Sequence, residues 1–179
     1  DCHSWRELTE GRAFISCPRG KPRGQGNRDG FYYPDEHALE REVAAVRAAV
    51  IARYGERVDQ AHATYAGFSQ GAILGVNMFG KRGGEYPYLV LIEGGYDYWS
   101  PKRAQDFKKT GGTRVLFACG TKTCDQGSRK PHEWIGASGA EARIEMAAGS
   151  GHTPLGGVVD KVRTSLPWLW SDQPSWTDR

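Results

Sequence analysis

Residues 65–73 read YAGFSQGAI, and this stretch places a serine between two glycines where one apolar run gives way to the next. The residues before Ser69 have the composition of a strand, and those after it have the spacing of a helix. A sharp strand-to-helix turn lifts a serine hydroxyl out of the sheet and aims helix N-terminal N–H groups at the same spot. Ser69 is therefore predicted as a nucleophile, with Gly67 and Gly71 removing side chains that would collide at the turn.

The rest of the chain alternates short apolar runs with amphipathic ones. Strands are predicted at 13–17, 63–69, 88–94, 114–120 and 142–149. Helices are predicted at 35–55, 71–79, 101–109, 130–140 and 155–170. Nearly continuous apolar strands separated by helices indicate a parallel sheet that is buried on both faces. The predicted fold class is α/β, with a mostly parallel sheet and helices on both faces, and a chain of 179 residues predicts a single domain.

Charge and hydropathy exclude several classes of partner. The 24 Lys and Arg against 21 Asp and Glu give a net charge of only +3, too small to indicate nucleic acid or an anionic membrane surface. No run approaches the roughly 18 apolar residues that a membrane span requires. The predicted partner is a small molecule, with no nucleic acid and no membrane span, and the sequence does not predict an oligomeric state.

The four cysteines fall into two pairs, Cys2 with Cys17 and Cys119 with Cys124. Two disulfides predict an oxidising compartment, so that the protein would be secreted or periplasmic, while free buried thiols are the alternative. Cys119 and Cys124 with His132 would supply only three zinc ligands at poor spacing. We therefore predict no metal site.

A serine hydroxyl is a poor nucleophile until a base takes its proton, so a histidine must lie nearby. Among the five histidines, His152 stands in AAGSGHTPLG, a flexible loop directly after the last predicted strand. From there an imidazole would reach over the carboxyl edge of the sheet. His152 is predicted as the general base.

Together, GFSQGA at 67–72 and GSGHTPLG at 149–156 resemble the small esterases of the α/β-hydrolase superfamily, the carboxylesterase, acyl-thioesterase and dienelactone-hydrolase-like group. ISCPRG at 15–20 is similar to that group's strand and loop before the helix that leads to the nucleophile strand. The resemblance implies a serine hydrolase that cleaves carboxylic esters or thioesters through an acyl-enzyme on Ser69. It implies no metal and no organic cofactor.

The resemblance also implies an acid in the loop after the strand that precedes the histidine strand. The first carboxylate there is Asp125, and a Cys119–Cys124 disulfide would tuck the loop back to present it to His152. A second position used by the superfamily lies one strand earlier, where IEGGYDYW offers Asp97 and Glu93. Asp125 is the favoured acid, and these two carboxylates are the alternatives.

One oxyanion donor is expected from the backbone N–H of Gln70, and the second from a loop after an earlier strand that typically begins His-Gly. No such loop precedes residue 13, so the resemblance implies that the domain, residues 1–179, lacks its N-terminal strands. Phe68 and Tyr96 are predicted to line the substrate pocket. A non-catalytic hydrolase scaffold that binds a ligand, an inactive fragment, and a peptidase with the same triad are the competing interpretations.

Overall fold

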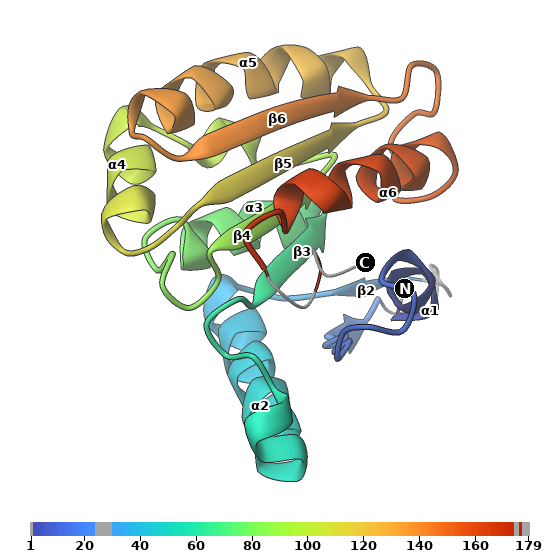
Figure 1. The fold of residues 1–179 in the computed structure, drawn as a ribbon. Helices are drawn as coiled ribbons and strands as arrows, with labels where there is room; N and C mark the ends of the chain where they lie inside the picture. The colour runs from blue at the N-terminus through green and yellow to red at the C-terminus, as the bar shows by residue number, and fades with distance from the viewer. Residues whose placement is uncertain (1, 24–29, 174–175, 177–179) are drawn as a thin grey trace. The chain divides into compact units, whose positions relative to one another are not determined.

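The computed structural model describes residues 2–23, 30–173 and 176, and the chain forms two compact units, Asp1–Asp59 and Gln60–Arg179. Figure 1 shows the first unit in blue and cyan and the second in green to red. The expectation of a single domain stays a prediction. Within the described residues, no helix combines the length and the apolar character needed to cross a bilayer.

In its described residues, the first unit has two α-helices and two short antiparallel strands. Its elements are α1 (Cys2–Leu8), β1 (Lys21–Pro22), β2 (Phe31–Tyr32), α2 (Glu36–Tyr54) and the 3-10 turn η1 (Gly55–Arg57). Helix α2 begins after Asp35, whose carboxylate accepts from the Ala38 N–H at 2.7 Å, and it ends at Gly55, whose φ of 55° suits glycine. The prediction of a helix at 35–55 is confirmed.

The predicted strand at 13–17 is wrong. Residues 14–20 carry no strand or helix, and the Cys2–Cys17 disulfide ties this segment to α1 instead. The apolar run is not buried in a sheet: Phe14 is 46% exposed and packs its ring on Tyr54, with ring centroids 4.5 Å apart. The apolar residues predicted a strand, but among the described residues no strand pairs with this segment.

The second unit is built on a four-stranded parallel sheet in the order β3-β4-β5-β6. The strands are β3 (Thr64–Phe68), β4 (Tyr88–Ile92), β5 (Arg114–Cys119) and β6 (Glu141–Met146). The last residues of β3 and β4 are paired, Phe68 with Ile92, so these strands end level with each other. All four carboxyl ends therefore meet at one edge of the sheet (Figure 1).

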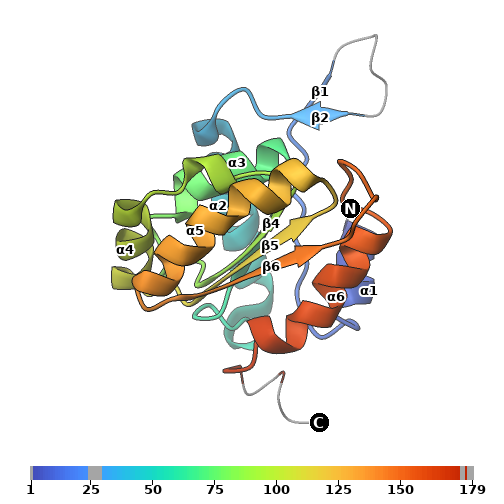
Figure 2. The same ribbon diagram turned by 90° about the horizontal axis from the view of Figure 1, so that it is seen from above.

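Helices cover both faces of this sheet. Helices α3 (Gln70–Phe79), α4 (Pro101–Lys109) and α5 (Lys122–Ala137) lie on one side, and α6 (Gly157–Leu169) lies on the other (Figure 2). The chain steps from strand to strand in one direction, and right-handed crossovers then place every connecting helix on the same face. The final helix has no further strand to reach and closes the opposite face. The predicted α/β class is confirmed.

The core explains why the strands read as apolar runs. Every residue of β4 is buried, and β5 is buried from Val115 onward, because both lie between helices on each face. β6 lies at the edge of the sheet and is more exposed, from Glu141 onward.

Candidate active site

Ser69 occupies a turn that few residues other than glycine adopt. It follows β3 directly and precedes the first residue of α3, with φ 51° and ψ −114°. Its N–H donates to the carbonyl of Ile92 at 2.9 Å, which ties the turn to the end of β4. This strained strand-to-helix turn is typical of a nucleophile elbow.

Close backbone approaches explain one of the two predicted glycines. A Cβ on Gly67 would lie 2.6 Å from the backbone of Gly71, so this glycine is required. The prediction for Gly71 is wrong, since a Cβ there would lie no closer than 3.8 Å to the Tyr65 hydroxyl. Sequence reasoning missed Gly94, where a Cβ would come within 2.7 Å of the Ser69 carbonyl oxygen.

His152 lies in the loop between β6 and α6, and its Nε2 is 3.0 Å from Ser69 Oγ. The imidazole is 54% exposed, and it also contacts the ring of Phe68, with centroids 4.9 Å apart. The loop is held by its backbone, because the Ala147 N–H donates to the Cys119 carbonyl at 2.7 Å. Serine and histidine are therefore placed together as the sequence predicted, although their catalytic roles stay predictions.

The carboxylate beside His152 belongs to Glu93. This residue follows β4 directly, and its Oε2 lies 3.2 Å from His152 Nδ1. Its side chain is only 2% exposed and its φ is 51°. The imidazole therefore bridges Ser69 and Glu93 through its two nitrogens.

Buried carboxylates need compensation, and Glu93 receives it from the loop after β5. Its Oε1 accepts from the N–H groups of Gly120 and Thr121, the latter at 3.0 Å. Its Oε2 accepts from the Thr121 hydroxyl at 2.9 Å. Thr121 is also the N-cap of α5, where the helix dipole favours a negative charge. All of these hydrogen-bond donors to the Glu93 carboxylate therefore come from two consecutive residues, Gly120 and Thr121.

Asp125 does not contact His152, and the prediction that it would is wrong. Helix α5 begins at Lys122, eight residues earlier than the sequence predicted, and it takes Asp125 into its first turn. There the carboxylate accepts from Arg129 at 2.8 Å. Asp97, another alternative, lies exposed in the 3-10 turn η2 (Tyr96–Tyr98). The Cys119–Cys124 disulfide is confirmed, but it holds Thr121 and not Asp125 in the site.

The other predicted site residues take different positions. Gln70 is the first residue of α3, so its N–H stands at the helix N-terminus beside Ser69. Phe68 contacts His152, as described above. The ring of Tyr96 packs on α5, where a Cβ on Gly127 would come within 2.4 Å of it. Burial raises the pKa of Tyr96, and the charges of Asp97 and Glu93 raise it further.

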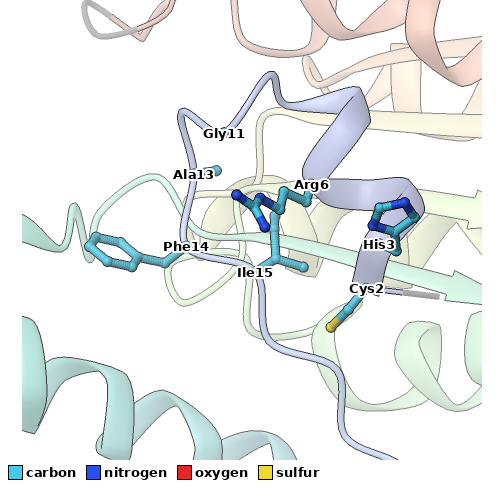
Figure 3. A pocket seen from close by; sticks show the side chains of 7 residues that line it. All are labelled: Cys2, His3, Arg6, Gly11, Ala13, Phe14 and Ile15. Carbon is cyan, nitrogen blue, oxygen red and sulfur yellow. The ribbon is translucent and has the colours of Figure 1, made fainter.

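Two other features could suggest a ligand. Side-chain atoms of Glu93, Cys119 and Cys124 lie within 4.8 Å of one another, but zinc binds thiolates, and these two sulfurs are bonded to each other. In the first unit a pocket is lined by residues of α1 and the segment after it (Figure 3), namely Cys2, His3, Arg6, Gly11, Ala13, Phe14 and Ile15. It contains none of the predicted site residues.

A parallel sheet with a serine on a strand-to-helix turn and a histidine after the last strand defines the α/β-hydrolase fold, and this chain has that fold. Solved structures agree. An uncharacterized protein from Bacillus cereus ATCC 10987 matches with TM-score 0.73 and 11% identity, over 95% of this chain and 54% of that protein. Esterase PE8 matches with TM-score 0.60 and 19% identity, over 85% of this chain and 76% of that protein.

Arabidopsis thaliana SOBER1 is also similar, with TM-score 0.52 and 16% identity, over 73% of this chain and 63% of that protein. The chain thus spans about half the length of the Bacillus cereus protein. No family model and no curated protein sequence matches the chain. At these identities the likeness concerns the fold, and the chemistry has to be argued from the site.

Proposed function

We propose that the protein is a serine hydrolase that cleaves carboxylic esters or thioesters through an acyl-enzyme on Ser69. The observation that carries this proposal is the continuous chain of contacts from Ser69 through His152 to Glu93. Three loops that are distant in sequence supply these groups at one edge of the sheet. The structural likeness to esterase PE8 supports a hydrolase scaffold.

The hydrogen-bond donors around Glu93 favour one tautomer of His152. Both carboxylate oxygens accept hydrogen bonds from the segment of Gly120 and Thr121, and a carboxylate can only accept, so His152 must donate to it. The proton between Glu93 and His152 therefore belongs on Nδ1. Nε2 is then bare and faces the Ser69 hydroxyl at 3.0 Å, as a general base requires.

The proposed reaction is a two-step acyl transfer. His152 takes the Ser69 proton as Oγ attacks the carbonyl carbon, and Glu93 stabilises the imidazolium. The Gln70 N–H, beside Ser69 at the start of α3, is the proposed donor to the oxyanion. His152 then protonates the departing alcohol or thiol, and it activates a water that releases the acid. Glu93 replaces Asp125 as the acid of this mechanism.

The two disulfides favour an oxidising compartment, so we place the enzyme outside the cytosol, secreted or periplasmic. Its proposed substrate is a small-molecule ester. No step of the mechanism requires a metal or an organic cofactor.

A fluorophosphonate probe tests the proposal, because it phosphonylates only an activated serine. We expect one adduct per chain by intact-mass spectrometry under non-reducing conditions, mapped to Ser69. Ser69→Ala should abolish the adduct and the hydrolysis of short p-nitrophenyl esters. Ser138→Ala, which removes a serine hydroxyl from the end of α5, should change neither. A folded protein that takes up no probe would contradict the proposal and favour a non-catalytic hydrolase scaffold.

A further inference from the structure

One short segment, Cys119 to Thr121, contacts both the acid and the loop of the base. Its N–H groups and the Thr121 hydroxyl donate to Glu93, as described above. Its backbone carbonyls accept hydrogen bonds from the loop that carries His152. The Cys119 carbonyl accepts from Ala147 at 2.7 Å, and the Gly120 carbonyl accepts from Gly151, directly before His152, at 3.2 Å. A change in this segment would therefore disturb both Glu93 and the loop that carries His152.

A disulfide between Cys119 and Cys124 closes a small ring that contains this segment. Cys119 is the last residue of β5, and Cys124 lies in the first turn of α5, with Cα atoms 5.4 Å apart. Both side chains are fully buried. The bond therefore ties the strand end to the helix start across the residues that hold Glu93.

The ring also orients the hydroxyl of Thr121. Its Oγ1 accepts from the Cys124 N–H at 3.2 Å, so the hydroxyl proton is directed to Glu93 Oε2 at 2.9 Å. The same oxygen of Glu93 faces His152 Nδ1 at 3.2 Å. The hydroxyl and the imidazole thus share one carboxylate oxygen, and the hydroxyl limits where that oxygen can lie.

We infer that the ring from Cys119 to Cys124 is a positioning element of the triad, with Thr121 as the positioning residue that holds Glu93 against His152. This inference rests on the proposed serine hydrolase. The inference gives the disulfide more than a structural role and Thr121 more than a capping role. The rate of the chemical step would depend on both the disulfide and the Thr121 hydroxyl.

Thr121→Val tests it, because valine keeps the shape of threonine and lacks the hydroxyl. We expect kcat for a p-nitrophenyl ester to fall about 10- to 100-fold, the range typical of groups that orient a catalytic side chain, with KM within about twofold. Thr121→Ser restores the hydroxyl and should recover most of kcat. Ser100→Ala is the matched control, since Ser100 caps α4 by accepting from the Arg103 N–H at 3.1 Å. It should lower the melting temperature and leave kcat unchanged.

A second pair of variants tests the disulfide. Replacing Cys119 and Cys124 by alanine should slow both turnover and fluorophosphonate labelling of Ser69, whereas replacing Cys2 and Cys17 should affect stability alone. Far-UV circular dichroism checks that each variant is folded. A labelled wild type whose Thr121→Val variant keeps full kcat would overturn the inference and leave the serine hydrolase intact. An unlabelled wild type would overturn the proposed function itself.

Discussion

Glu93→Gln is the substitution that most directly tests the proposed site. Glutamine has the same shape as glutamate but offers one carbonyl oxygen and one NH₂ group. The carbonyl can keep the two N–H donors of Gly120 and Thr121. The NH₂ group must then face the Thr121 hydroxyl and His152 Nδ1, and it can only donate to them. His152 would have to accept at Nδ1 and carry its proton on Nε2, where it faces Ser69.

That tautomer cannot act as a base toward the serine hydroxyl, so the effect should be large. Amide substitution of a triad acid lowers kcat by about 10⁴-fold when the geometry is otherwise kept. We expect kcat/KM to fall roughly 10³- to 10⁴-fold, which corresponds to about 4–5.5 kcal/mol of transition-state stabilisation. Glu93→Asp keeps the charge but shortens the side chain, and a displacement of about 1 Å in such a site costs on the order of 10²-fold.

The assay is hydrolysis of p-nitrophenyl acetate and butyrate at pH 8, with thermal unfolding to confirm that each variant is folded. Asp125→Asn is the matched control because it removes the carboxylate after β5 that the sequence resemblance favoured as the triad acid. Its partner Arg129 is 67% exposed, so loss of the ion pair should cost less than about 1 kcal/mol of stability and leave turnover within twofold. Refutation would come from the opposite ranking, a folded and active Glu93→Gln beside an inactive Asp125→Asn.

Two further predictions concern stability. Gly67→Ala should destabilise the protein by about 3 kcal/mol or more because its Cβ would lie 2.6 Å from the backbone of Gly71, while Gly71→Ala should be neutral or stabilising by up to about 1 kcal/mol. Equal denaturation midpoints for these two variants would contradict this reasoning. Burial raises the pKa of Asp172, but the hydrogen bond from Tyr88 and the guanidinium of Arg114 outweigh burial and hold this pKa below its usual range. A lowered pKa in the folded state stabilises the protein above about pH 4 and loses that effect as the pH falls, so Asp172→Asn should cost about 1 kcal/mol at pH 7 and little at pH 2. A cost that stays constant across this range would argue against the charge.

The sequence predicted the elements that carry their own local signals. Helix α4 spans 101–109 as predicted, because Ser100 and Pro101 mark its start and the charged stretch marks an exposed face. The serine and the histidine could be found because each stands next to glycines at the end of a predicted strand. Helix α1 was missed since its seven residues carry little periodicity.

The acid could not be assigned in this way. Asp125, Asp97 and Glu93 all follow strands, and the choice among them depends on which one meets donors from a neighbouring loop. A local signal did exist, because Thr121 is a good N-cap and places Asp125 inside a helix. Two of the three donors that hold Glu93 are backbone N–H groups of the loop after β5, and a sequence does not indicate where such groups point.

The loops at the site are held mainly by main-chain groups, and this has a consequence for how the protein can be recognised. The carbonyls of Cys119 and Gly120 hold the histidine loop whatever side chains that loop carries. Space restricts substitution at a few glycines, such as Gly67 and Gly94, and the proposed mechanism would restrict it at Ser69, His152 and Glu93. Most other residues of these loops can be substituted without changing the backbone geometry of the site. A TM-score of 0.73 beside an identity of 11% is the outcome that such an architecture permits.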